Sequence, residues 1–210
     1  MAKNQSISMS VIRRLPRYYR FLYDLMENGV TRISSRDLAA RMGLTASPIR
    51  QDLNCFGGFG QQGYGYIVEQ LYTEIGHILG VDNPSGAILI GAGNLGCAIA
   101  NHINFEIRGI RLTGIFDDSP AITGTHIQEL TVMPTAALEE FCRAHNPSIA
   151  ILCIPKEAAP DLVRRMMALG IRSFWNFSHY DIGFDYPDAI VENVHLGDSL
   201  LTLAYQTKAE

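Results

Sequence analysis

A glycine-rich loop between an apolar run and a helix-forming segment constrains the fold of this chain more than any other feature. The run AILI at 87–90 predicts a buried strand, the loop GAGNLG fills 91–96, and the residues CAIANHINF that follow are helix-forming. A strand that leads through glycines into a helix is an arrangement that binds the pyrophosphate of a dinucleotide. Free N–H groups and the dipole at the start of the helix attract anions.

Each glycine of this loop has a different expected role. Gly91 makes the tight turn, Gly93 lets the backbone approach the pyrophosphate, and Gly96 allows the helix to pack closely on the strand. A second strand, 111–116, ends at Asp117, 26 residues after Gly91. A carboxylate at this place accepts the ribose hydroxyls and repels the 2′-phosphate of NADP, so NAD or NADH is the expected cofactor.

Short apolar strands alternate with helices through the rest of the chain. Such alternation predicts a parallel sheet covered by helices, which makes residues 81–194 an α/β Rossmann domain. A short leucine-rich helix over about 196–206 follows it. Further strands are expected at 148–155, 171–176 and 190–194, and helices at 135–145 and 157–169.

The first 80 residues predict a different, smaller domain. A helix at 15–28 precedes two short helices at 35–43 and 46–56, which gives a helix-turn-helix pattern. The glycine- and aromatic-rich run GGFGQQGYGYIV then suits a hairpin wing, and a helix at 68–79 ends the domain. We therefore expect a winged-helix domain over 1–80.

The charge of the chain is divided unevenly between its two parts. Residues 1–66 hold nine Lys and Arg against four acids, a net charge of +5, while the remainder has a net charge of −9. A basic head on an acidic body indicates that the head binds double-stranded DNA. A solvated basic surface, or a helical subdomain used only for dimer packing, is the open alternative. The candidate DNA contacts are Arg13, Arg14, Arg17, Tyr19, Ser47, Arg50, Gln51, Asn54, Gln61, Gln62 and Tyr64.

Several classes of protein are disfavoured. The four cysteines form no C-x-x-C pair, which argues against a zinc site and a disulfide framework. No apolar stretch approaches 18 residues, and the polar start MAKNQSISMS lacks the apolar centre of a secretory signal. A cytoplasmic protein without a membrane segment is expected.

Catalytic machinery is not evident beside the dinucleotide loop. His77, His126, His145 and His179 are isolated in the sequence, and little chain remains to build a substrate domain. A dinucleotide without a catalytic group indicates a sensor rather than an enzyme. A small NAD-dependent oxidoreductase with an incidental basic head is the alternative.

Seven short runs are spread over almost the whole chain: RLPRYYRFL, RISSRDLA, IRQDLNCFGGFG, QGYGY, GAGNLG, FDDSP and WNFS. Together they resemble the Rex family of redox-sensing transcriptional repressors. The resemblance implies a homodimer in which the C-terminal helix, 195–210, is swapped between subunits. It also implies that NAD+ permits operator binding and that NADH releases the DNA. The implied cofactor contacts are Gly91, Ala92, Gly93, Asn94, Leu95, Gly96, Asp117, Pro155 and Asn176.

The resemblance also implies a switch between DNA-binding and free states. Arg20 would pair across the dimer with an acidic residue just before the tail helix. When NADH binds, that acidic residue would leave Arg20 and contact a tyrosine of the Rossmann helix instead. In this chain His195 stands for the acid and His102 for the tyrosine. Two imidazoles share one hydrogen bond only when at most one is protonated, so weak coupling with a pH dependence is expected. The alternative is that Glu192 or Asp198 supplies the missing carboxylate.

Three more positions depart from the family pattern. Pro48 stands on the recognition helix and Gln62 on the wing where polar or basic residues are usual. Cys97 directly follows the glycine loop at a helix N-terminus, where a thiolate is favoured, so its oxidation would block the pyrophosphate site. A small residue packed under the cofactor is the alternative for Cys97.

Overall fold

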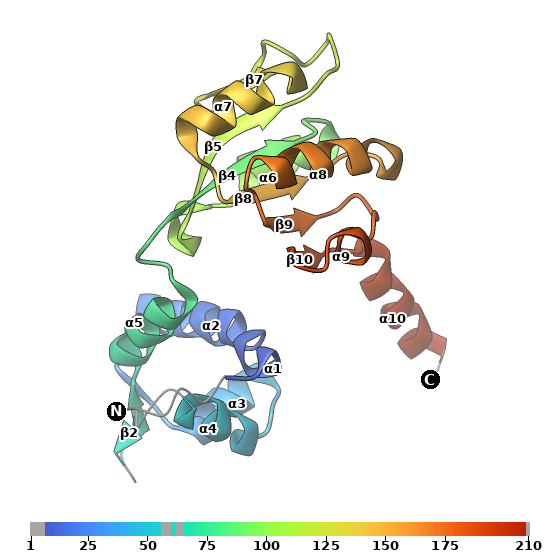
Figure 1. Cartoon of the computed structure of the whole chain (residues 1–210). Helices are drawn as coiled ribbons and strands as arrows, with labels where there is room; N and C mark the ends of the chain where they lie inside the picture. Colours follow the sequence, from blue (N-terminus) through green and yellow to red (C-terminus); the bar gives the residue numbers. More distant parts are fainter. Residues whose placement is uncertain (1–6, 56–59, 62–64, 209–210) are drawn as a thin grey trace. The chain divides into compact units, whose positions relative to one another are not determined.

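The computed structural model describes residues 7–55, 60–61 and 65–208. The chain divides into two compact units, Met1–Asn83 and Pro84–Glu210, and each is described by itself below (Figure 1).

The N-terminal unit is a small helical domain completed by a three-stranded antiparallel sheet of strand order β1-β3-β2. Its core includes Leu15, Tyr18, Leu22 and Leu25, which recur at helical spacing on one face of α2. Its helices are α1 (Met9–Ile12), α2 (Leu15–Glu27), α3 (Ser35–Met42), α4 (Ala46–Asn54) and α5 (Val68–Leu79), and its strands are β1 (Arg32–Ile33), β2 (Gly60–Gln61) and β3 (Gly65–Ile67).

Local signals explain where these helices begin and end. The Ser34 hydroxyl accepts a hydrogen bond from the Asp37 N–H at the start of α3, and Gly43 ends that helix in the left-handed conformation. Thr45 occupies the N-cap position of α4, but its side chain makes no capping hydrogen bond. The four helices expected at 15–28, 35–43, 46–56 and 68–79 are confirmed with ends that differ by at most two residues.

The C-terminal unit is a seven-stranded sheet of order β10-β9-β8-β4-β5-β7-β6. Neighbouring strands are parallel except β6 and β7, which form an antiparallel hairpin. The elements are β4 (Ser85–Ile90), α6 (Asn94–His102), the 3-10 turn η1 (Glu106–Arg108), β5 (Ile110–Phe116), β6 (His126–Ile127), β7 (Leu130–Met133), η2 (Thr135–Ala137), α7 (Leu138–His145), β8 (Ile149–Leu152), η3 (Lys156–Ala158), α8 (Ala159–Ala168), β9 (Ser173–Asn176), α9 (Ile182–Asp185), β10 (Ile190–Asn193) and α10 (Leu196–Lys208).

Alternate residues of β4 face opposite sides of this sheet. Ile88 and Ile90 pack with α7, α8 and α9 in one core cluster, whereas Ala87 and Leu89 pack with α6 in another. The expected Rossmann domain is confirmed, with helices on both faces. The β6–β7 hairpin was not expected, because strands of two and four residues carry little periodic signal.

A groove opens on the face of the sheet that also packs against α6. A cavity of about 390 Å³ lies over β8, β9 and β10 and is lined mainly by apolar side chains, among them Ile103, Phe105, Ile151, Trp175 and Ile190. Its lining comes from strands, from η1 and from the segment between α6 and η1, and no α-helix among the described residues contributes to it.

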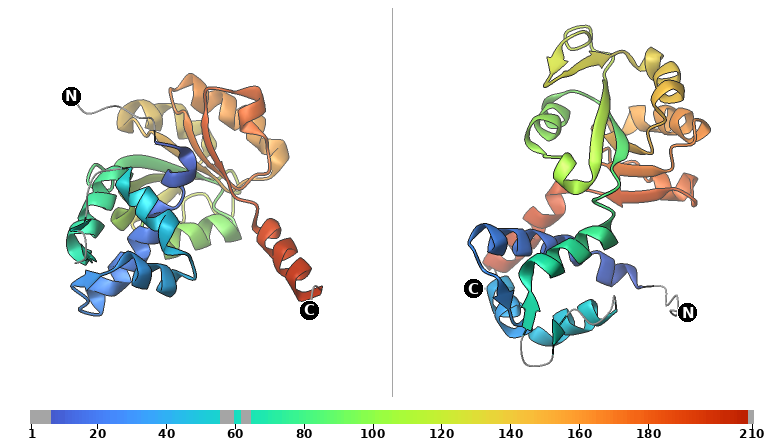
Figure 2. Two further views of the ribbon diagram at one scale, coloured as in Figure 1. Left: turned by 90° about the horizontal axis from the view of Figure 1, so that it is seen from below. Right: turned by 90° about the vertical axis from the view of Figure 1, so that its left-hand side faces the viewer.

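The C-terminal helix α10 packs on nothing that buries it. Figure 1 and the left view of Figure 2 show α10 extending from the end of β10 away from the sheet. None of its residues is buried, and Leu196, Leu200, Leu201, Leu203 and Tyr205 are all exposed. An isolated helix of this length is marginal in water, so α10 needs a partner surface.

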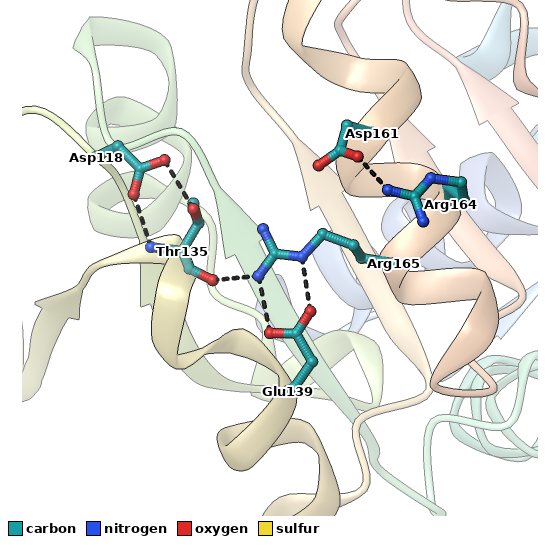
Figure 3. Close-up of polar contacts among 6 residues, drawn as sticks. All are labelled: Asp118, Thr135, Glu139, Asp161, Arg164 and Arg165. Carbon is teal, nitrogen blue, oxygen red and sulfur yellow. Dashed lines mark hydrogen bonds and ion pairs between the residues drawn. The ribbon is translucent and has the colours of Figure 1, made fainter.

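An ion pair joins α7 to α8 on the other face of the sheet (Figure 3). Arg165 donates from Nε and Nη2 to the two carboxylate oxygens of Glu139, at 2.6 and 2.8 Å. The Arg165 hydrogen bonds are the main reason that the pKa of Glu139 is lowered to about 2.

We predict that Glu139→Gln lowers the free energy of unfolding by about 1 kcal/mol at pH 7, because the pair is only partly exposed. A lowered carboxyl pKa stabilises the fold above its unfolded value of about 4.3. The difference between wild type and variant should therefore shrink as the pH falls from 5 towards 2. Urea unfolding at several pH values measures it. The exposed pair Asp161–Arg164 on α8 supplies the control, since Asp161→Asn should change little at any pH.

Candidate functional site

The glycine-rich loop lies at the carboxyl edge of the parallel sheet. The loop follows β4, which lies between β5 and β8 in the sheet. The strands β5, β6 and β7 lie on one side of β4, and the later strands β8, β9 and β10 lie on the other. In open α/β sheets, ligands bind in the crevice at such a switch point. The loop at 91–96, Asp117 after β5, Pro155 after β8 and Asn176 at the end of β9 all lie at this edge.

The three glycines of the loop have different surroundings. Gly91 has a φ of +94°, and a Cβ on it would lie 2.4 Å from the Cys153 carbonyl oxygen of the loop after β8. A Cβ on Gly96 would lie 1.9 Å from the Gly91 oxygen. A Cβ on Gly93 would meet nothing within 4 Å. The packing of the backbone therefore requires glycine at positions 91 and 96. At position 93 the absence of a side chain leaves open the space that a pyrophosphate would use.

Asp117 lies against this loop. Its Oδ2 accepts a hydrogen bond from the Ala92 N–H at 2.7 Å, and its Oδ1 accepts one from the Ser119 N–H at 2.8 Å. Each carboxylate oxygen retains a second lone pair that can accept a hydroxyl. The carboxylate expected to hold the ribose is thus fixed beside the start of α6. The residues present fit a dinucleotide.

The neighbouring acid, Asp118, makes contacts within the protein instead of facing the loop (Figure 3). Its two oxygens accept hydrogen bonds from the N–H and the hydroxyl of Thr135, at 2.8 and 2.7 Å. Arg165 holds the carbonyl oxygen of the same threonine at 2.6 Å. Asp118 therefore ties the end of β5 to the start of η2, the turn that leads into α7, and leaves Asp117 to face the loop. Sequence reasoning missed Thr135, which has no motif of its own.

Asn176 is almost fully buried, and its side-chain amide is saturated within the protein. Its Nδ2 donates to the Tyr180 carbonyl and to Asn193 Oδ1, each at 2.8 Å, and its Oδ1 accepts from the Ser178 N–H and hydroxyl. An amide has two donor and two acceptor positions, and all four are used. Pro155, by contrast, is exposed at the end of β8. Asn176 is thus suited to shaping the edge rather than to direct side-chain contact with a ligand.

The two histidines expected to form the switch are not paired with each other. His102 is exposed at the end of α6 and lines a cavity of about 570 Å³. His195 instead lies against His179, with stacked rings and an Nδ1–Nδ1 distance of 2.8 Å. A hydrogen bond between two Nδ1 atoms requires that one ring be neutral there. The contact of His179 with His195 was not predicted, because His179 is isolated in the sequence.

Cys97 and Cys153 both lie near the glycine loop. The Cys97 thiol donates to the Ala92 carbonyl at 3.0 Å, so it is held under the loop. Burial raises the pKa of the Cys153 thiol to about 12, which keeps it protonated at neutral pH. All four cysteines of the chain are free.

The N-terminal unit presents one polar helix face. Ser47, Arg50, Gln51 and Asn54 are exposed on α4 at positions i, i+3, i+4 and i+7, and Pro48 is exposed beside them. The opposite face of the helix buries Ile49, Asp52 and Leu53. Four of the expected DNA contacts thus share one exposed face of α4.

The expected contacts around α2 have varied surroundings. Arg13 and Arg20 are exposed. Arg17 donates to the Met42 carbonyl at 2.6 Å, and Arg14 donates to Asp52. Tyr19 stacks on Tyr72 of α5, with ring centroids 4.2 Å apart, so its ring is a packing element. Gln62 and Tyr64 lie outside the described residues, and of Gln61 only the backbone, in β2, is described.

The two units define a class of protein: a winged-helix head followed by a Rossmann-type nucleotide-binding domain. Family models match both parts, a putative DNA-binding protein N-terminus over residues 6–54 and a CoA binding domain over residues 82–180. The chain belongs to the Rex family of redox-sensing transcriptional repressors. It is 52% identical over 210 residues to the Rex repressor of Thermoanaerobacter pseudethanolicus, covering all of this chain and 93% of that one. It is 51% identical to the Rex repressor of Clostridioides difficile, covering 99% of each.

Solved structures extend the likeness to the fold. A crystal structure of RSP in complex with β-NAD+ and operator DNA matches with a TM-score of 0.88 at 50% identity, covering 98% of this chain and 94% of that one. RSP in complex with β-NADH matches with a TM-score of 0.88 at 48% identity, covering 98% and 96%. These relatives are named as repressors, which favours a regulator over the alternative of an oxidoreductase.

Two further features are absent from the described residues. No helix there is long and apolar enough to cross a membrane. No group of three or more His, Cys, Asp or Glu side chains in that part of the chain is placed to hold a metal ion.

We predict that Gly93→Ala leaves the free energy of unfolding nearly unchanged but abolishes binding of NAD+ and NADH, because its Cβ fills only the space for the pyrophosphate. Gly96→Ala is the matched comparison. Its Cβ collides with the Gly91 oxygen, so it should destabilise the domain itself. Thermal unfolding and calorimetric titration with each cofactor separate the two effects. Tight cofactor binding by Gly93→Ala would contradict the assignment of this loop.

Proposed function

We propose that this protein is a repressor that binds palindromic operator DNA as a homodimer and leaves it when NADH replaces NAD+. The observation that carries the proposal is the likeness of both units, over 98% of the chain, to a repressor crystallised with β-NAD+ and operator DNA. As a DNA-binding regulator with bacterial relatives, it would act in the cytoplasm. The domain limits proposed are 1–80, 81–194 and 195–210.

The cofactor proposed is NAD(H), held by the loop 91–96 with Asp117 and Pro155. The open space at Gly93 and the position of the Asp117 carboxylate support it. We propose that Asn176 contributes by fixing the Ser178–Tyr180 segment, since its amide is already saturated.

The DNA interface proposed centres on α4. Arg50 and Gln51 would read base edges in the major groove, because their exposed side chains share one helix face with Ser47 and Asn54. Arg13, Arg17 and the wing residues Gln61, Gln62 and Tyr64 would hold the flanking backbone. A dimer would place two such helices on two half-sites.

The homodimer is supported by two apolar surfaces without a partner inside one chain. One is the groove over β8, β9 and β10, and the other is the exposed leucine face of α10. A second copy supplies both surfaces at once in a symmetric assembly. We propose that α10 is swapped between subunits.

The switch proposed involves Arg20, His102 and His195. His195 immediately precedes α10 and is held by His179, so its protonation bears on how that helix leaves the sheet. Protonation of both rings would break their hydrogen bond, which supports a pH dependence of the coupling.

The central test is titration of NAD+ and NADH, separately, into a complex of the protein with labelled palindromic DNA. NADH should release the DNA and NAD+ should not. Arg50→Ala should weaken operator binding by about 1–3 kcal/mol if it makes a bidentate base contact. NADH binding by Arg50→Ala, measured without DNA, should equal that of wild type. Turnover of NADH with a small substrate, and no response of the DNA complex, would instead favour an oxidoreductase.

We predict that Leu200→Glu/Leu203→Glu converts the proposed dimer to a monomer without unfolding either domain. Both side chains are exposed in one chain and would be buried in the proposed swapped dimer. Sedimentation analysis gives the oligomeric state, and circular dichroism checks the fold. Gln206→Glu adds a charge to the same helix at an exposed polar position and should remain dimeric. A double variant that remains dimeric would exclude α10 from the interface.

A further inference from the structure

Asp52 on α4 is unusual because it is a charged side chain in the core of the head. It is 2% exposed, and the other buried polar residues of the described chain, Thr135, Asn176 and Ser178, are uncharged. It lies between Ile49 and Leu53 on the inner face of the recognition helix. An ionised carboxylate there is costly unless it is paired and hydrogen-bonded.

Three hydrogen bonds satisfy this carboxylate. Arg14 donates from Nε to Oδ2 and from Nη2 to Oδ1, each at 2.6 Å, and the Tyr18 hydroxyl donates to Oδ2 at 2.6 Å. Burial alone would raise the pKa of Asp52, yet the hydrogen bonds from Arg14 and Tyr18 lower it below its ordinary value. The carboxylate therefore stays charged at neutral pH.

The donors come from a different part of the domain. Tyr18 lies on α2 and Arg14 immediately before it, 34 and 38 residues from Asp52. The two parallel hydrogen bonds of a planar guanidinium fix both the distance and the orientation of the carboxylate that accepts them, whereas apolar contacts have no such directionality. The group therefore sets how α4 is rotated about its own axis.

Such a group contributes little net stability. Replacing a buried ion pair by apolar side chains of similar volume is often neutral or stabilising, and some buried polar groups serve specificity instead. Rotation of α4 matters for specificity because successive helix positions differ by about 100° in direction. A small rotation would turn Arg50 and Gln51 away from base edges.

We propose that Asp52, Arg14 and Tyr18 are positioning residues that hold the outer face of α4 in the orientation needed to read operator bases. The proposal rests on the proposed function. It also reassigns Arg14. Two of its N–H groups are committed to Asp52, so its main role is not a phosphate contact, although its side chain is 41% exposed.

The test compares wild type with Arg14→Met/Tyr18→Phe/Asp52→Leu, which replaces the group by apolar side chains. The triple variant should unfold in urea at or above the wild-type midpoint. Its preference for operator over random DNA should fall. The expected fall is roughly 5- to 150-fold for each bidentate side-chain contact with a base that is lost. Affinity for random DNA and its salt dependence should change little.

A matched control removes an Arg–carboxylate pair outside the head. Arg165→Met/Glu139→Leu, measured at saturating NAD+, should retain the wild-type preference for operator. Should the triple variant not fold, Arg14→Lys keeps the charge but removes the fork, and the same fall in preference is expected.

Two results would overturn the proposal. One is an unchanged preference for operator in a folded variant. The other is an equal loss of affinity for operator and random DNA with a flatter salt dependence, which would make Arg14 a phosphate contact. Failure of the wild type to prefer any palindromic DNA would overturn the proposed function as well.

Discussion

The glycine-rich loop brings backbone closer to backbone than side chains permit, and the geometry of the cofactor domain depends on this approach. Space for a Cβ is missing at Gly91 and at Gly96, which lie against the Cys153 carbonyl and the Gly91 oxygen. This packing brings the start of α6 to the carboxyl edge beside β8. The Ala92 N–H then reaches Asp117, which links the first βα turn to the end of β5. Helix dipole, free N–H groups and a carboxylate consequently converge where a dinucleotide needs them.

Features carried by residue type at fixed spacing could be predicted from the sequence. The loop, the strand before it and the acid after the next strand are encoded locally, as is the exposed face of α4. Features made by contacts across the fold could not. Asp118, adjacent to the predicted Asp117, shows the difference: only the position of Thr135 decides that it supports the structure. Similarly, nothing local in the sequence indicates that the Asn176 amide is fully used by its neighbours.

The head shows why charge alone is a poor guide to individual contacts. The excess of arginine in this region predicts a DNA-binding surface, but it does not distinguish arginines that face solvent from those that hold the domain together. Arg14 is committed to Asp52, whereas Arg50 is exposed on the outer face of α4. Arg17 combines both, because it donates to the Met42 carbonyl and is still exposed. An acid on the inner face of an amphipathic helix was the available signal. It indicates that some basic residue must be turned inwards to meet it.

A repressor of this kind must transmit the state of the cofactor domain to the head, and the two belong to separate compact units of the chain. The transmitting element needs to be coupled to the nucleotide edge and free to contact another surface. α10 meets both conditions. It begins directly after His195, which is tied through His179 to the segment fixed by Asn176, and its leucine face is uncovered. Since a short isolated helix is marginal, the position of α10 is set by whichever surface it contacts. In the proposed swapped homodimer, dimer formation and redox response would then be one property of the assembly, because the same helix would carry both.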